Sequence, residues 1–165
     1  DAVGVGLVLS VGPLVAALAG VPAGRMADRF GARRMTLAGL IALGLGCFTL
    51  SALPRTFGIA GYLAPMVIIT LGYAVFQTAN NTVVMSNVAP DRRGLVSALL
   101  NLSRNLGLIT GASVLGAVFA LASNSIDINA APPEAVASGM RVTFVVAWGL
   151  IGTACLIALI SRRSH

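Results

Sequence analysis

The stretch Gly24-Arg25-Met26-Ala27-Asp28-Arg29-Phe30-Gly31-Ala32-Arg33-Arg34 carries four arginines and one aspartate between two uncharged apolar segments. The apolar segments, residues 2–23 and 35–54, are each long enough to cross a bilayer core of roughly 30 Å as a helix. Gly24 and Gly31 permit a positive φ and close backbone approach where the chain reverses. The sequence therefore predicts a short basic turn between two membrane helices.

The composition excludes an ordinary soluble protein and indicates that the chain lies in a lipid bilayer. Hydrophobic residues make up 57% of the 165 residues and charged residues 10%, whereas soluble domains have roughly a quarter charged residues. The net charge is +6, but the arginines are divided among short loops and do not form one continuous basic face. We therefore expect no nucleic-acid partner.

Charges and turn residues divide the chain into five apolar segments, each expected to be a transmembrane helix of one membrane domain, residues 1–165. The expected fold is thus an all-α membrane protein. Pro65 is a candidate position for a bend in the third helix, and Pro133 is expected to start a short separate helix before the fifth. The five spans are expected at about residues 2–23, 36–53, 59–88, 94–122 and 141–161.

Arginines gather in three places that lie on one side of the membrane if the five helices alternate in direction: residues 25–34, 92–93 and 162–163. The positive-inside rule makes that side, with the C-terminus, cytoplasmic. The N-terminus would then lie outside, and because nothing resembles a signal peptide, we expect a fragment that lacks at least one upstream span. All basic residues are arginine, which indicates a GC-rich bacterial gene and hence the bacterial inner membrane.

Residues 24–33 follow the spacing Gly-x-Met-Ala-Asp-Arg-x-Gly-x-Arg, which resembles the signature of the major facilitator superfamily of transporters. In that family the signature lies between the second and third helix of each six-helix half. Residues 77–81 (Gln-Thr-Ala-Asn-Asn), 92–94 (Arg-Arg-Gly) and 103–107 (Ser-Arg-Asn-Leu-Gly) look most like the fourteen-span drug:proton antiporters. The resemblance implies five helices of an incomplete C-terminal half, with the N-terminal part of the same transporter as its partner.

The resemblance also implies that the basic turn is a conformational latch, whose charged groups grip neighbouring helices in one access state and release them in the other. Ala32 departs from the pattern, because the family usually has a basic residue there, so one contact of the latch is expected to be absent. The alternative is a basic turn that only fixes the topology. The residues implied in the latch are Gly24, Asp28, Arg29, Gly31 and Arg33.

Two of the expected helices carry polar faces. Arg104 is the one charged side chain within an apolar segment, about 15 Å along its helix from Gly94, at a depth where an arginine costs roughly 2.5–3.5 kcal/mol to insert. Such a cost predicts a polar partner or a water-filled cavity. We expect a substrate cavity lined by polar residues of the third and fourth helices: Thr70, Tyr73, Gln77, Asn80, Asn81, Asn101 and Arg104.

Simpler interpretations stand beside these. Arg104 can instead extend along its stem to the cytoplasmic headgroups, and the amides of residues 77–81 can serve only to join helices by hydrogen bonds. Tyr73 also fits a packing role with a satisfied hydroxyl. Gly107 and Gly111, four residues apart, are expected to let two membrane helices approach closely.

No Asp, Glu or His falls inside an expected span. If transport is coupled to protons, the titratable carboxylate is therefore expected in the missing part of the transporter. Cys47 and Cys155 lie in apolar runs as packing residues, and we expect no disulfide, metal or cofactor. The chain has no phosphate-binding loop and no nucleophile paired with a base, so we expect no enzyme activity.

The leading hypothesis is part of a secondary active transporter that exports small amphipathic or cationic organic compounds by alternating access, in exchange for protons. Its expected ligands are the small-molecule substrate and protons. An uptake permease of the same superfamily is the nearest alternative, because the signature does not give the direction of transport. A non-transporting membrane scaffold and an inactive truncated product are the alternatives from other classes.

Overall fold

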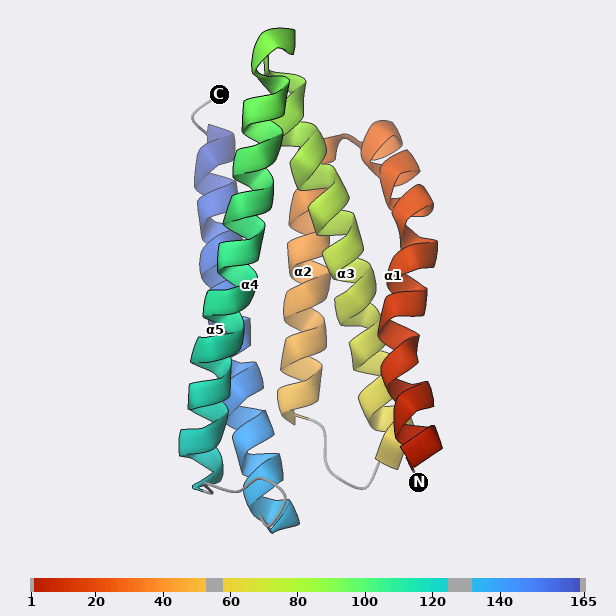
Figure 1. The fold of residues 1–165 in the computed structure, drawn as a ribbon, viewed down its shortest axis with the longest axis vertical. Helices are drawn as coiled ribbons and strands as arrows, with labels where there is room; N and C mark the ends of the chain where they lie inside the picture. The colour runs from red at the N-terminus through yellow and green to blue at the C-terminus, as the bar shows by residue number, and fades with distance from the viewer. Residues whose placement is uncertain (1, 53–57, 125–131, 164–165) are drawn as a thin grey trace.

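The computed structural model describes residues 2–52, 58–124 and 132–163, which are almost entirely helical and contain no strand. This confirms the all-α fold (Figure 1). Five long helices follow one another, with one short 3-10 helix, η2, before the fourth. Their bounds are α1 Ala2–Phe30, α2 Ala32–Ala52, α3 Gly58–Ser86, η2 Pro90–Arg92, α4 Arg93–Ser123 and α5 Pro133–Arg163.

Four helical segments within the described residues are long and apolar enough to cross a membrane. They are Ala32–Ala52, Gly61–Ser86, Pro90–Ser123 and Pro133–Ser161. The chain is therefore an all-α membrane protein. The first expected span, residues 2–23, is not among these four segments and stays a prediction.

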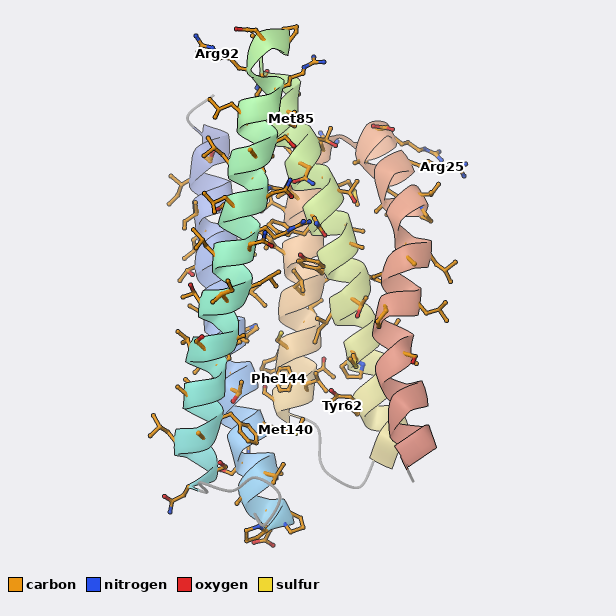
Figure 2. The ribbon with its side chains drawn as sticks, viewed as in Figure 1. Arg25, Tyr62, Met85, Arg92, Met140 and Phe144 are labelled. Carbon is orange, nitrogen blue, oxygen red and sulfur yellow. The ribbon has the colours of Figure 1, made fainter. Side chains whose placement is uncertain are left out.

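Consecutive helices run in opposite directions (Figure 1). The α1–α2 turn, η2 and the C-terminal end of α5 lie at one end of the bundle, and the N-terminus lies at the other. Figure 2 places Arg25 and Arg92 at the first of these ends and Tyr62 and Met140 towards the opposite end. The three arginine-rich places thus share one end of the bundle, and its cytoplasmic location remains a prediction.

The tightest packing lies between α2 and α3, where glycines bring the two backbones together. A Cβ added to Gly39 would lie 2.5 Å from the backbone nitrogen of Phe76, and one added to Gly72 would lie 2.8 Å from that of Leu43. The chain's most buried apolar side chains lie on α1, α2 and α3, and Ala27, Met35 and Ala79 form a cluster among them. The core therefore sits in this three-helix group, and α4 and α5 add to its side through α2–α5 and α4–α5 contacts.

The reversal between the first two helices is much shorter than the sequence predicts. Helix α1 continues through Arg25 and Asp28 to Phe30, and Gly31 alone joins it to α2. Gly31 has a φ of 88°, and its carbonyl accepts hydrogen bonds from the backbone N–H groups of residues 34 and 35, both at 3.1 Å. A helix can include charged residues where it lies outside the bilayer core. Arg25 and Asp28 therefore did not mark the end of α1.

The separate short helix expected at Pro133 is wrong, because α5 is one continuous helix from Pro133 to Arg163. Its first turn is closed by the carbonyl of Pro132, which accepts hydrogen bonds from the N–H groups of Ala135 and Val136 at 2.9 and 3.2 Å. Gly139 does not interrupt the helix because it packs on Phe119 of α4. Pro65 likewise lies inside α3, which continues through it.

Candidate functional site

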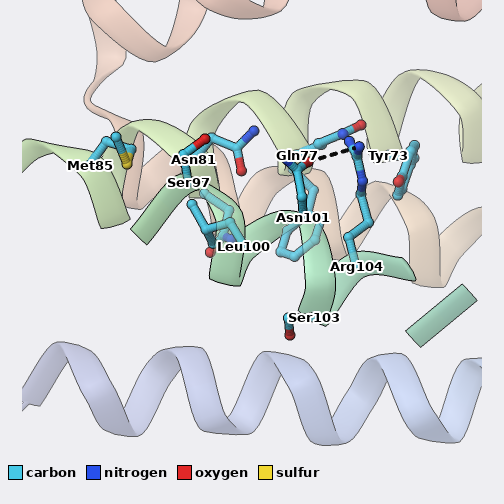
Figure 3. Close-up of a pocket in the computed structure, with 11 residues that line it drawn as sticks. Tyr73, Gln77, Asn81, Met85, Ser97, Leu100, Asn101, Ser103 and Arg104 are labelled. Carbon is cyan, nitrogen blue, oxygen red and sulfur yellow. Dashed lines mark hydrogen bonds between the residues drawn. The ribbon is translucent and has the colours of Figure 1, made fainter. Parts of the chain in front are cut away.

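A cavity of about 330 Å³ lies between α3 and α4; we call it the α3–α4 cavity (Figure 3). The two helices touch only over a small area, in contrast to α2 and α3. Polar side chains of both helices face this space. It is lined by Tyr73, Phe76, Gln77, Asn80, Asn81 and Met85 of α3 and by Ser97, Leu100, Asn101, Ser103 and Arg104 of α4.

Helical periodicity explains why these side chains meet. Residues spaced by three or four positions share one face of a helix, and the lining residues of α3 and α4 follow that spacing. The opposite face of α4 carries exposed leucines, including Leu99, Leu102 and Leu106. Helix α4 therefore turns polar residues towards the cavity and leucines away from it, the pattern of a membrane helix beside a polar space.

Arg104 is the charged residue of the lining. Its Nη2 donates a hydrogen bond of 3.1 Å to Oδ1 of Asn101, one turn earlier on α4. In Figure 3 the side chains of Arg104 and Gln77 point towards each other from opposite helices, with Tyr73 beside Arg104. This bond and the lining place the guanidinium on the cavity face of α4, and whether Arg104 serves the cavity or extends to the headgroups stays a prediction.

No carboxylate lines the α3–α4 cavity. Asp91, the acidic residue of η2, lies at the end of the bundle and is 3.9 Å from Arg92, with both side chains largely exposed. Within the described ranges, no group of three or more His, Cys, Asp or Glu residues could hold a metal ion. The cavity thus has one positive charge, several amides and hydroxyls, and aromatic surface from Tyr73 and Phe76.

The structure brings together most of the residues predicted for the cavity. Tyr73, Gln77, Asn80, Asn81, Asn101 and Arg104 all line it. Thr70 does not line it, and its hydroxyl donates a 2.8 Å hydrogen bond to the carbonyl of Met66 on its own helix. That the cavity binds substrate remains a prediction.

Other lining residues were not predicted: Phe76, Met85, Ser97, Leu100 and Ser103. Ser97 lies on the same helical face as Asn101 and Arg104, which is a signal that the sequence contains. The apolar members carry no such signal, because nothing distinguishes Phe76 or Leu100 from packing residues until the facing helix is known.

The residues of the predicted latch are divided between two helices. Asp28 is exposed near the end of α1 and forms no ion pair with any residue of the described ranges. Arg29 lies over the ring of Phe30, 5.5 Å from its centroid. Gly24 is an ordinary helical position, with nothing described within 4 Å of an added Cβ. The grip on neighbouring helices that the latch implies is therefore not made by Asp28 in this arrangement.

Arg33 is the latch residue that lines a groove between helices. It lines a groove with residues of α2, α3 and α5, which we call the Arg33 groove: Arg33, Thr36, Leu37, Asn80, Val83, Ala158 and Ser161. It also lines a second depression beside Gly31 and the end of α3. Asn80 lines both the Arg33 groove and the α3–α4 cavity, so the two sites adjoin across α3.

Gly107 and Gly111 meet no neighbour within the described residues, since nothing lies within 4 Å of a Cβ added to either. The close helix approach expected at these glycines thus stays a prediction about a helix outside the described part of the chain. The close approaches that the structure does contain are at Gly39, Gly46 and Gly72 between α2 and α3, and at Gly139 between α5 and α4.

The fold and the cavity define a multi-pass α-helical membrane protein with a polar cavity between its helices, the architecture typical of membrane transporters. The family profile described as Major Facilitator Superfamily matches residues 1–165. The chain therefore belongs to the major facilitator superfamily.

Three curated relatives extend this result. The chain is 28% identical over 126 residues to the multidrug efflux pump LfrA of Mycolicibacterium smegmatis, covering 76% of this chain and 25% of that protein. It is 28% identical over 145 residues to the uncharacterized transporter YebQ of Escherichia coli, covering 84% and 32%. It is 26% identical over 115 residues to the riboflavin transporter RibZ of Clostridioides difficile, covering 70% and 25%.

The chain thus spans about a quarter to a third of the length of the curated relatives it matches. No solved structure matches it significantly.

Proposed function

We propose that this chain is part of a secondary active transporter that exports small amphipathic organic compounds by alternating access, in exchange for protons. The observation that carries the proposal is the α3–α4 cavity, in which amides, hydroxyls, aromatic rings and one arginine meet between two helices of an apolar bundle. Polar side chains within a membrane helix cost free energy, and they commonly mark a pathway for substrate or ions. The mixture of apolar and polar surface in this cavity suits an amphipathic ligand.

Export is the direction we favour because one relative is a multidrug efflux pump. The lining of the α3–α4 cavity supplies no titratable carboxylate, so we propose that the proton-binding group belongs to the remainder of the transporter. That remainder would pack against this chain and close the cavity. We propose the bacterial inner membrane as its location, with the arginine-rich end of the bundle facing the cytoplasm.

We further propose that the α1–α2 junction controls the change between access states. Arg33 is its acting residue, because it lines the groove formed with α3 and α5, whereas Asp28 is free to find a partner in another state. Rocking of one bundle against another would bring new partners to Asp28 and Arg33.

Transport can be tested in cells that lack their own efflux pumps and express the complete transporter. Accumulation of a panel of amphipathic dyes is measured with the proton gradient intact and after its collapse by an ionophore. The proposal expects lower dye accumulation in expressing cells and loss of that difference after collapse. Unchanged accumulation across the panel would overturn the export proposal.

Uptake is the second candidate, because a relative is described only as a riboflavin transporter. Higher accumulation of a panel compound in expressing cells would establish uptake and reverse the proposed direction. Expression at normal membrane levels with no change for any compound would favour a scaffold or an inactive product.

A further inference from the structure

We infer that the α3–α4 cavity binds its substrate through an anionic group, a carboxylate, which Arg104 receives together with the amide of Gln77. This inference rests on the proposed transport function and narrows its substrate class. The sequence suggested amphipathic or cationic compounds, and the cavity favours amphipathic anions.

The first argument is the charge of the cavity. Arg104 is the charged residue of the lining, and none of the lining residues is acidic. A cationic group placed beside it would meet like charge, and the repulsion would be strong once the remainder of the transporter covers the cavity and excludes water. An anionic group would instead neutralise a guanidinium whose insertion in the bilayer is costly without a partner.

The second argument is the geometry of the guanidinium. An arginine has five N–H donors in a planar fork that matches a carboxylate. Within the described residues, Arg104 uses one donor for the 3.1 Å hydrogen bond to Asn101. The side chains of Arg104 and Gln77 point towards each other from the two helices (Figure 3). The remaining donors are thus directed at the space between the two helices.

The third argument is the surface around this fork. Tyr73 and Phe76 contribute rings and Leu100 and Met85 contribute aliphatic surface to the same lining. The volume of about 330 Å³ lies at the small end of the range of known ligand pockets, roughly 300–1,000 Å³. The cavity therefore suits a compact aromatic carboxylate, with its ring on the apolar lining and its anionic group at Arg104.

Binding of two probes that differ only in charge tests this inference: naphthaleneacetate and its neutral analogue naphthaleneacetamide. Equilibrium dialysis with the purified complete transporter in detergent measures both affinities without requiring turnover. Wild type should bind the acetate about tenfold more tightly than the acetamide, the effect of one charge-assisted hydrogen-bonded pair. Arg104→Gln should lose that preference and bind the acetamide as wild type does, and Arg104→Lys should keep part of it.

Arg92→Gln is the matched control, because it removes the same charge from an exposed residue outside the cavity. It should bind both probes as wild type does. Equal affinity of wild type for the two probes would overturn the inference, as expected if an acidic side chain from the remainder of the transporter already neutralises Arg104. A preference for the acetate that survives in Arg104→Gln would overturn it as well.

The binding measurement tests the anion inference and the transport measurement tests the export proposal, so either claim can be overturned while the other stands. If wild type exports panel dyes but Arg104→Gln keeps full preference for the acetate, the anion inference is wrong and the export proposal stands. If Arg104 governs acetate binding but no compound is exported, the export proposal is wrong and the anion site stands.

Discussion

Helix α3 has two neighbours that it meets in opposite ways. Towards α2 it presents Gly72 and the backbone around Phe76, so closely that a Cβ on Gly39 would lie 2.5 Å from a backbone nitrogen. Towards α4 it presents Gln77, Asn80 and Asn81, and a cavity of about 330 Å³ separates the helices. One face of the helix is filled by backbone contact and the other is left open and polar.

The difference follows from how helices associate in lipid. Small residues let backbones approach until van der Waals contact holds them together, whereas polar side chains hold helices only through specific hydrogen bonds. In the described residues no hydrogen bond between side chains joins α3 to α4, since the bond of Arg104 stays within α4. We expect α2 and α3 to move as a unit and the distance between α3 and α4 to change during transport.

The largest effect is expected from breaking the close contact. Gly39→Leu would force a side chain against the backbone at Phe76 and Gly72, and such overpacking should cost about 3 kcal/mol or more. The amount of monodisperse protein in detergent and its thermal unfolding midpoint should both fall sharply.

Gly152→Leu is the control for this change, because nothing described lies within 4 Å of an added Cβ there. It should leave yield and midpoint close to wild type. Equal loss in both variants would show that the contact between α2 and α3 is not special.

The next largest effect is expected from cross-linking α3 to α4 across the α3–α4 cavity. In a Cys47→Ala, Cys155→Ala background, Asn81→Cys with Ser97→Cys places one thiol on each helix of the α3–α4 cavity. A cleavable bifunctional thiol reagent should reduce transport of a panel dye to background, and a reductant should restore it.

The pair Thr36→Cys with Val83→Cys is the control, since both residues line the Arg33 groove on α2 and α3. Cross-linking this pair should leave most of the transport activity. Inhibition by the control link alone would place the moving boundary between α2 and α3 and reverse the comparison.

The comparison also marks what the sequence could predict. The periodic polar residues predicted the α3–α4 cavity, because Gln77, Asn101 and Arg104 are polar residues within otherwise apolar segments. The glycines of the close contact gave no such signal, since small residues occur on every helix and a sequence does not say which faces meet. Gly107 and Gly111 were chosen by their spacing, whereas Gly39 and Gly72 make the observed contacts.

The sequence predicted where the basic junction between the first two helices lies, but the predicted shape of that junction was wrong. The sequence predicted a turn of residues 24–34, and only Gly31 leaves the helical conformation. Helix ends depend on local hydrogen bonds and on the position of the bilayer surface. The pattern of apolar residues predicts neither of these. Likewise, the groove that Arg33 lines together with residues of α3 and α5 depends on how distant segments pack.

A smaller effect is expected at Asp28, which belongs to the closely packed group yet is exposed. If Asp28 finds its partner only in another access state, Asp28→Asn should lower the transport rate about tenfold, the size of a typical coupling energy. Its unfolding free energy should stay within about 0.5 kcal/mol of wild type, as for other surface substitutions.

Rate and stability are both measured on purified, reconstituted transporter. Asp91→Asn is the matched control, since it removes the other exposed aspartate at this end of the bundle. A wild-type rate for Asp28→Asn would refute the latch and leave the basic junction with a topological role.

An effect of about the same size is expected from substituting the junction residue itself. Gly31 has a φ of 88°, so Gly31→Ala should cost about 1–2 kcal/mol in unfolding free energy. Gly24→Ala, at a helical position with open space around it, should be neutral or stabilising by up to about 1 kcal/mol. Chemical denaturation in mild detergent compares the two, and equal effects would mean that the left-handed conformation is not required.

The length of the connection between two helices limits how far their joined ends can separate, and the connection at Gly31 is one residue long. One residue spans at most about 3.6 Å, so the ends of α1 and α2 are tethered with no slack and cannot slide apart. Between α3 and α4 the chain has residues 87–89 and the short η2, which make a longer connection. The backbone itself thus ties α1 to α2 more closely than it ties α3 to α4, the boundary that carries Arg104.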